Sequence, residues 1–96
     1  MEILSWLQEW YSKQCDGDWE HGNGIKITTI DNPGWYVTVS LNGTHFEEIR
    51  VDVVQVDRTD EDWIYCKIED GCFTGAGGPG NLEEILNTFH KWVTFE

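Results

Sequence analysis

The spacing of hydrophobic residues predicts a helix near each end of the chain. From Ile3 to Gln14 the apolar side chains recur every three or four positions, as on one face of an amphipathic helix. A second apolar stripe follows Asn81 and contains Leu82, Ile85, Leu86, Phe89 and Val93. Glu84 stands three residues after Asn81, and this spacing is typical of a capping box. We therefore expect Asn81 to cap the second helix.

Between the two helical segments, apolar and polar side chains alternate, which is typical of β-strands. The alternating runs begin near Ile25, Trp35, Ile49, Ile64 and Phe73. The pattern predicts an α+β fold with an N-terminal helix, a four- to five-stranded antiparallel meander sheet and a C-terminal helix. Because both helices are amphipathic, we expect both to cover the same aliphatic face of the sheet. We expect one domain that spans residues 1–96.

Two local features set the expected strand register. A three-residue loop, Leu41 to Gly43, keeps apolar positions of the second and third strands opposite each other and sets Trp35 opposite Ile49. The apolar parity of the third strand changes between Val53 and Val54, which predicts a β-bulge there. The further pairs that we expect are Val56–Ile64, Val51–Ile68 and Ile68–Phe73.

The other face of the expected sheet carries aromatic residues. Tyr36, Trp63 and Tyr65 have the outward parity, which they share with Thr28, Thr38, Arg50 and Lys67. Exposed aromatic rings among polar side chains are typical of a protein-binding surface. Alternatively, the rings only cover the sheet of a small protein, and the sequence favours neither interpretation.

Composition and charge narrow the function classes. The 96 residues are 40% hydrophobic and 14% aromatic, as in a packed globular protein rather than a disordered one. Eighteen acidic residues against six basic ones give a net charge of −12. Such a charge repels phosphate backbones and anionic lipids, so we expect no nucleic-acid and no membrane partner. It attracts basic proteins.

Targeting and redox signals indicate a cytoplasmic protein. No apolar run approaches the ~20 residues that a membrane span needs, and the first residues lack the basic start of a secretory signal. The chain has three cysteines and no Cys-x-x-Cys pair, which fits a reducing compartment better than a disulfide framework.

The densest polar cluster lies between Asp16 and His21. Asp16, Asp18 and Glu20 offer carboxylate ligands and His21 an imidazole, so one hypothesis is a metal site. The spacing fits no known ligand template. A turn with Trp19 anchored in the core explains the cluster structurally, and acidic contacts to a basic partner explain it functionally.

The remaining candidates for chemistry are weak. The glycine-rich segment 75–81 leads into a helix like a phosphate-binding loop, but it lacks the Gly-Lys-Ser/Thr ending. Close passage of the backbone past another element is the simpler explanation. Cys66 falls on the core face of a strand, where thiols are inert. Cys15 and His21 are six residues apart across a turn, a weak signal for a nucleophile. We expect no catalytic residue, no metal and no cofactor.

Acidic residues also crowd the loop expected between the third and fourth strands. Asp57, Asp60, Glu61 and Asp62 lie there with Arg58 as the one basic residue. Such a run is usually a solvated loop. Because it precedes Trp63, it can also steer a basic partner toward an aromatic anchor.

Three segments of the chain resemble the bacterial immunity protein 53 family. They are 6–11, the stretch 14–35 with its Asp-Gly-Asp-Trp-Glu-His and Asp-Asn-Pro-Gly-Trp phrases, and 73–86 with its glycine-rich phrase. The resemblance runs nearly end to end. It implies a non-catalytic protein of a polymorphic toxin system, which binds and neutralises a cognate toxin. It supplies no residue-level site.

The sequence therefore predicts an immunity protein that binds a cognate, basic toxin. The expected contact residues are Tyr36, Asp60, Glu61, Asp62, Trp63, Tyr65, Asp16, Asp18 and Glu20. One alternative is a metal-dependent or enzymatic module built on Asp16–His21. Another is a homo-oligomeric interaction protein that hides Trp63 and Tyr65 against its own copy.

Overall fold

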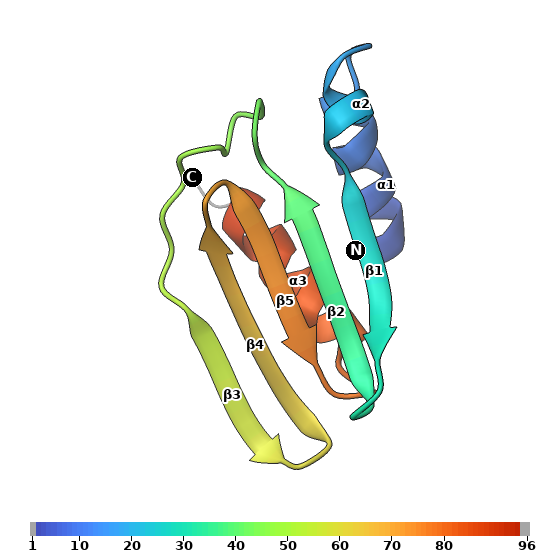
Figure 1. The fold of residues 1–96 in the computed structure, drawn as a ribbon, viewed down its shortest axis with the longest axis vertical. Helices are drawn as coiled ribbons and strands as arrows, with labels where there is room; N and C mark the ends of the chain where they lie inside the picture. Colours follow the sequence, from blue (N-terminus) through green and yellow to red (C-terminus); the bar gives the residue numbers. More distant parts are fainter. Residues whose placement is uncertain (1, 95–96) are drawn as a thin grey trace.

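The computed structural model describes residues 2–94 and has the predicted α+β organisation (Figure 1). The elements in chain order are α1 (Ile3–Gln14), α2 (Trp19–Gly22), β1 (Ile25–Ile30), β2 (Gly34–Ser40), β3 (Val54–Thr59), β4 (Asp62–Glu69), β5 (Cys72–Gly77) and α3 (Leu82–Thr94). The single helical turn of α2 lies where the sequence predicted a turn. Its Trp19 is buried, and the indole Nε1 donates to the carbonyl of Asn42 at 2.8 Å, so the predicted anchor is confirmed.

The strand order is β1-β2-β5-β4-β3, with antiparallel neighbours throughout. The predicted meander is therefore wrong, because β5 lies between β2 and β4. After β2 the chain crosses to the far edge of the sheet, and β5 returns to its centre (Figure 1). The core-facing positions of β5 include Gly75 and Gly77, which leave room for α3 above the centre of the sheet.

The third strand begins later than predicted. Residues 41–53 form turns and irregular backbone, so Trp35 lies opposite Thr29 and Gly77 instead of Ile49. The amide of Leu41 donates to the carbonyl of Gly71 at 2.8 Å, which ties the end of β2 to the β4–β5 turn. β5 thus takes the place beside β2 that we expected the third strand to fill. The register irregularity in β3 falls between Asp57 and Thr59, not at the predicted bulge. The pairs Val56–Ile64 and Ile68–Phe73 are confirmed, and Val51 and Val53 lie outside the strands.

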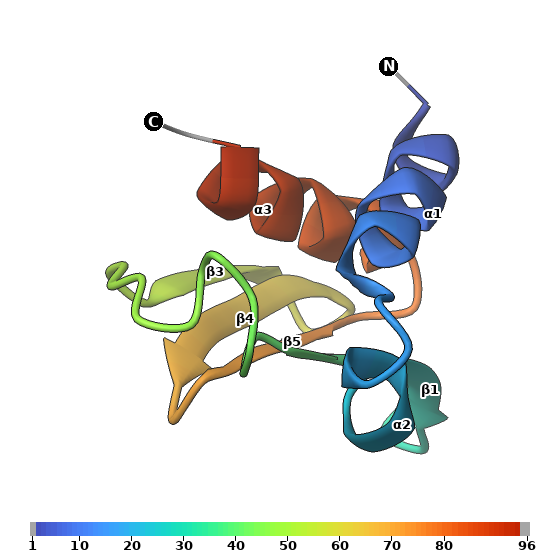
Figure 2. The same cartoon turned by 90° about the horizontal axis from the view of Figure 1, so that it is seen from above.

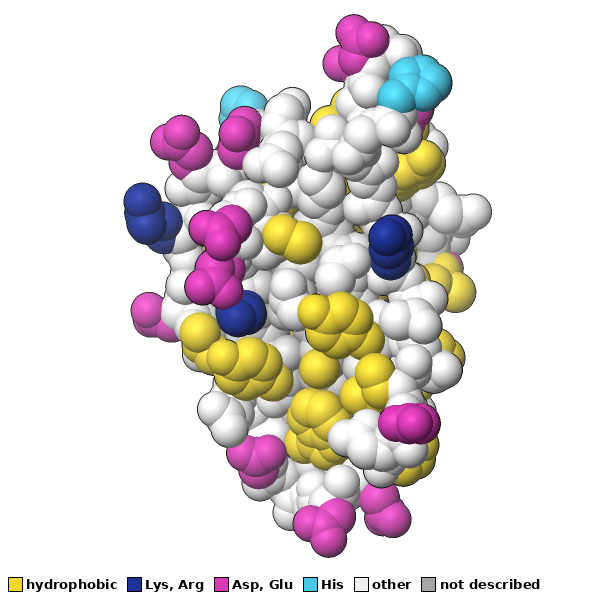
Figure 3. All heavy atoms as spheres, viewed as in Figure 1, with side chains coloured by type: hydrophobic (Ala, Val, Ile, Leu, Met, Phe, Trp, Pro, Cys, Tyr) yellow, Lys and Arg dark blue, Asp and Glu magenta, His cyan; other side chains and the backbone are white. Residues whose placement is uncertain are grey.

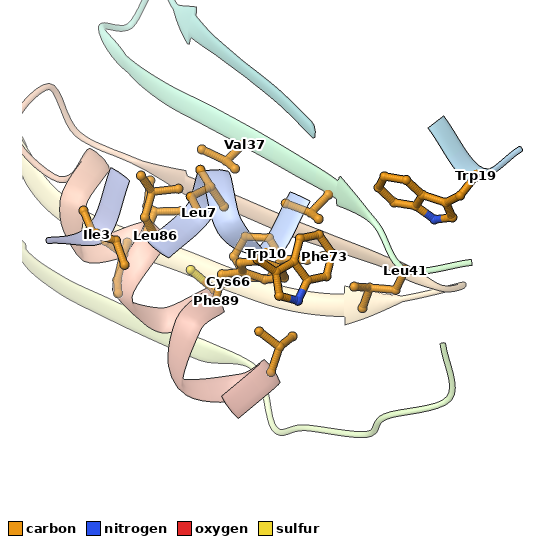
Figure 4. Close-up of a cluster of buried hydrophobic side chains, with 14 residues drawn as sticks. Ile3, Leu7, Trp10, Trp19, Val37, Leu41, Cys66, Phe73, Leu86 and Phe89 are labelled. Carbon is orange, nitrogen blue, oxygen red and sulfur yellow. The ribbon is translucent and has the colours of Figure 1, made fainter. Parts of the chain in front are cut away.

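Both long helices cover the same face of the sheet, as predicted (Figure 2). Phe73 of β5 and Phe89 of α3 are fully buried between the two layers, with ring centroids 5.0 Å apart. Trp10 of α1 meets Phe89 edge-on at 5.1 Å, so one aromatic cluster joins both helices to the sheet (Figure 4). The remaining buried apolar residues are Ile3, Leu7, Trp19, Val37, Val39, Leu41, Ile64, Cys66, Ile85, Leu86 and Val93.

The glycine-rich segment before α3 serves close packing. A Cβ atom at Gly75 would overlap Cγ2 of Ile85, and one at Gly78 would overlap the carbonyl oxygen of Glu61. Only glycine permits both approaches, because any other residue adds a Cβ atom at these points. The interpretation of these glycines as points of close backbone approach is confirmed.

Asn81 precedes α3 as predicted, but its side chain does not form the predicted capping box. Its Oδ1 accepts from the amide of Trp63 at 3.3 Å. Its Nδ2 donates to Asp62 Oδ1 at 2.9 Å and to Glu84 Oε1 at 3.0 Å. Strand β4 passes so close to the start of α3 that the side-chain oxygen of Asn81 bonds to a strand amide instead of an amide in the first turn of the helix. Asn81 therefore fixes the helix to the sheet.

Candidate protein-binding surface

The sheet face opposite the helices carries a row of side chains that crosses all five strands. Strand pairing places Thr28, Tyr36, Ala76, Tyr65 and Gln55 side by side in this row. Neighbouring strands lie about 4.8 Å apart, so the two tyrosines are roughly 10 Å apart with the small Ala76 between them. Figure 3 shows hydrophobic side chains gathered on this face of the molecule. We call this face, with the side chains that point from it, the open face.

Trp63 enlarges the aromatic area toward the β3–β4 turn. It lies two residues before Tyr65 in β4 and therefore points to the same side, opposite Asp57 of β3. A hollow of about 440 Å³ beside it is lined by Asp57, Arg58, Thr59, Asp60 and Trp63. The predicted association of an aromatic ring with acidic residues is thus present at this end of the open face.

Asp62 forms an ion pair and a hydrogen bond within the protein and does not belong to the open face. Its carboxylate accepts from Arg58 at 3.0 Å and from Asn81, and Arg58 also contacts Glu84 of α3 at 2.6 Å. Arg58 and then Asn81 lower the pKa of Asp62, while Asp62 and Glu84 raise the pKa of Arg58. Because these charges compensate one another, Asp62 has less free charge for a partner than Asp60 or Glu61, which form the turn itself.

In the Asp16–His21 cluster, the carboxylates of Asp16 and Glu20 bond to backbone amides of the same segment. Asp16 Oδ1 accepts from the amides of Asp18 and Trp19, both at 2.9 Å, and the Trp19 amide is the main cause that lowers the pKa of Asp16. The Glu20 carboxylate accepts from the amides of Asp16 and Gly17. These bonds shape the turn between α1 and α2. The turn lies at the opposite end of the long axis from Asp60 and Glu61, so the two predicted acidic groups do not form one cluster (Figure 1).

The open face also carries basic residues. Lys67 contacts Glu69 of the same strand at 2.8 Å, and this contact raises the pKa of Lys67 and lowers that of Glu69. Lys26 of β1 shares the outward parity with Thr28. Arg50, which we expected on this face, lies in the irregular segment before β3 instead. The open face is therefore mixed in charge at its centre, and acidic residues lie at both of its ends.

Some residues of this surface were not predicted from the sequence. Ala76 and Thr74 lie on the open face because β5 is central, and the strand order was not predicted. Asp57 lies in β3 beside Trp63 and not in a loop. Alternation with the inward-facing Val54 and Val56 could have identified it.

Two candidates for catalytic chemistry, a reactive Cys66 and a metal site, find no support in the described residues. Cys66 is fully buried, and burial raises the pKa of its thiol to about 11, so it is not a thiolate at neutral pH. Within residues 2–94, no three His, Cys, Asp or Glu side chains lie where they could share a metal ion. Over the same residues, no helix is both long and apolar enough to cross a bilayer.

This α+β protein is small and acidic, and its helices leave an aromatic face of the sheet uncovered. These features make it a candidate binding protein. The family model of immunity protein 53 matches residues 4–94 of this chain. The chain therefore belongs to the immunity protein 53 family, which supports an immunity function and suggests a non-enzymatic role. No curated protein and no solved structure matches it.

Proposed function

We propose that this protein neutralises a cognate, basic toxin by direct and stoichiometric binding through the open face. Tyr36, Trp63 and Tyr65 are the proposed anchors, and Asp60 and Glu61 the main steering charges. The negative potential that attracts the toxin also includes contributions from Asp62, Asp16, Asp18 and Glu20. The observation that supports the proposal best is the row of aromatic residues on a sheet face that no described helix covers.

The aromatic residues suit tight binding because their rings bury a large area at a small entropic cost. Tyr36 is 39% exposed, while Trp63 and Tyr65 are half-buried, so the rings lie partly ordered against the sheet before any partner arrives. Hot-spot residues are enriched in tryptophan and tyrosine near the centre of an interface, and replacing one by alanine costs about 2 kcal/mol or more of binding free energy. The open face thus offers preformed anchors.

The charge of −12 suits rapid capture of a basic partner. Opposite charges raise association rates well above the neutral range of about 10⁵–10⁶ M⁻¹s⁻¹. Asp60 and Glu61 project from the tip of the β3–β4 hairpin, where no described basic side chain contacts either carboxylate. They are therefore well placed to attract a cation.

The first experiment is co-purification of the tagged protein from its source, followed by co-expression of the recovered partner with and without this protein. Relief of toxicity, together with a one-to-one complex that high salt weakens, is the expected result. Neutralisation without a complex, for example by destruction of the toxin, would contradict stoichiometric binding.

Charge reversal at the hairpin tip tests the steering role. Asp60→Lys with Glu61→Lys is expected to slow association with the toxin about 10-fold or more at low salt, with little effect on dissociation. The matched control is Glu9→Lys with Glu83→Lys, which changes the net charge equally on the exposed sides of α1 and α3. Equal slowing in both variants would mean that the hairpin tip has no particular role.

A further inference from the structure

Strand β1 forms one edge of the sheet, and half of its backbone groups face outward. The amide of Ser40 in β2 donates to the carbonyl of Gly24 at 3.0 Å, so Gly24 points toward β2. Because backbone groups alternate along an antiparallel strand, Lys26 and Thr28 also point toward β2. Ile25, Ile27 and Thr29 then direct their N–H and C=O groups away from the sheet.

The same three residues direct their side chains to the face that carries α1. There a hollow of about 350 Å³ is lined by Leu7, Gln8, Tyr11, Gly24 and Ile25. Of the five large hydrophobic residues that are exposed in the described chain, three belong to α1 and β1: Leu4 at 53%, Tyr11 at 38% and Ile27 at 40%. An apolar hollow therefore lies between α1 and the start of β1, and the exposed Leu4 and Ile27 belong to the same two elements. We call this hollow, together with the exposed apolar side chains of α1 and β1, the groove.

This edge has few of the features that normally prevent strand addition. β1 contains no acidic residue and no proline, and all six of its residues pair with β2 in unbroken register. Its one charged residue, Lys26, has its backbone groups directed at β2 and its side chain on the open face. The other edge strand, β3, has an irregular register and contains Asp57 and Arg58. Long, regular and apolar edges are ready templates for another strand.

We infer that the β1 edge and the groove below α1 bind an extended segment of a partner protein, which adds to the sheet as a sixth, antiparallel strand. The segment carries apolar side chains at alternate positions, which fill the groove, and basic residues at both ends. This inference rests on the proposed function, since it gives the toxin a second contact, at the edge of the sheet, in addition to its contact with the open face. In such an arrangement backbone hydrogen bonds supply affinity, and the groove selects the side chains of the bound segment.

The charges at the two ends of β1 select the occupant. Asp16, Asp18 and Glu20 lie before the start of the strand, and Asp31 follows its end. A second copy of this chain, paired antiparallel through β1, would place the acidic start of one strand beside Asp31 of the other. Two molecules of net charge −12 would also repel each other. A segment with basic ends is attracted at both positions.

The test uses a synthetic peptide, Lys-Lys-Val-Thr-Val-Thr-Val-Lys-Lys, capped at both ends, and amide hydrogen exchange of the full chain. At a peptide concentration about ten times the dissociation constant, exchange of the Ile25, Ile27 and Thr29 amides is expected to slow about tenfold. Exchange of the Lys26 and Thr28 amides, which face β2, is expected to change little. Unchanged exchange at Ile25, Ile27 and Thr29 with millimolar peptide would overturn the inference.

Two methylated peptides separate strand addition from simple charge attraction. Valine side chains that fill the groove have their amides directed at β1, so methylation of the three valine amides is expected to abolish binding. A peptide with both threonine amides methylated keeps its charge and is expected to bind like the parent. Equal binding of both methylated peptides would overturn strand addition.

Two protein variants connect the groove to the toxin. Ile27→Lys is expected to weaken peptide binding and toxin binding at least 10-fold, whereas Val53→Lys, at an exposed apolar residue outside the groove, leaves both unchanged. Neutralisation at full strength by Ile27→Lys would overturn the inference and leave the proposed function intact. If the unaltered protein fails to neutralise the toxin, the proposed function fails, and the peptide results then decide the groove alone. A dimer that protects the β1 amides without peptide would show a second copy as the occupant and overturn the inference.

Discussion

Phe89→Ala is expected to lower the free energy of unfolding by about 3–5 kcal/mol, the usual cost of removing a buried phenylalanine ring. The Phe89 side chain is fully buried, and its ring centroid lies 5.1 Å from that of Trp10 in α1 and 5.0 Å from that of Phe73 in β5. Its removal leaves a cavity where α1, α3 and the sheet meet. Proteins of this size have only about 5–15 kcal/mol of stability, so the variant is expected to be close to unfolding.

Urea denaturation followed by tryptophan fluorescence measures this loss directly. The midpoint is expected to fall while the slope stays constant, which indicates lost stability without a change in the surface exposed on unfolding. Leu4→Ala is the matched control, because Leu4 is apolar and 53% exposed, and its loss is expected to cost less than about 1 kcal/mol. Similar losses for both variants would contradict the placement of Phe89 at the centre of the core.

Tyr36→Ala combined with Tyr65→Ala is expected to weaken toxin binding about 100-fold or more. Each ring is a proposed anchor worth at least about 2 kcal/mol, and every 1.4 kcal/mol corresponds to about a factor of ten in affinity. The two rings flank Ala76 in one row across the sheet, so a single partner side chain can lie between them. Their outward position means that the double variant is expected to keep its fold.

The conservative variant Tyr36→Phe with Tyr65→Phe serves as the control for this prediction. It keeps both rings and removes only the hydroxyl groups, so toxin affinity is expected to fall much less than in the alanine variant. Calorimetric titration of the toxin into each variant gives the affinities, and circular dichroism checks the fold. An alanine double variant that binds as tightly as the unaltered protein would show that the tyrosines are not anchors.

Local patterning predicted both long helices and most of the core, because burial imposes a period on the residues that face inward. The same argument predicted that Tyr36, Trp63 and Tyr65 share a face, since their parity opposes that of the buried Val37 and Ile64. The parity of a strand does not depend on its neighbours. The prediction that the three aromatic residues share a face is therefore confirmed, although the predicted strand order is wrong.

The strand order could not be predicted from local patterning. Residues 49–53 alternate as convincingly as β5 does, and both could have paired with β2. The choice depends on contacts distant in sequence: β5 presents Gly75 and Gly77 under α3, and Asn81 ties the start of α3 to β4 at Trp63. The internal role of Asp62 depends on the same contacts. Contacts between residues far apart in the sequence cannot be predicted from the pattern within one segment.

Hydrogen exchange of the protein in complex with its toxin tests the central claim most directly. The account predicts slower exchange along β2, β4 and β5 and at the Asp60–Glu61 turn, with little change along α3, whose buried side faces the sheet. Protection that is concentrated on α3 and absent from the sheet would contradict binding through the open face.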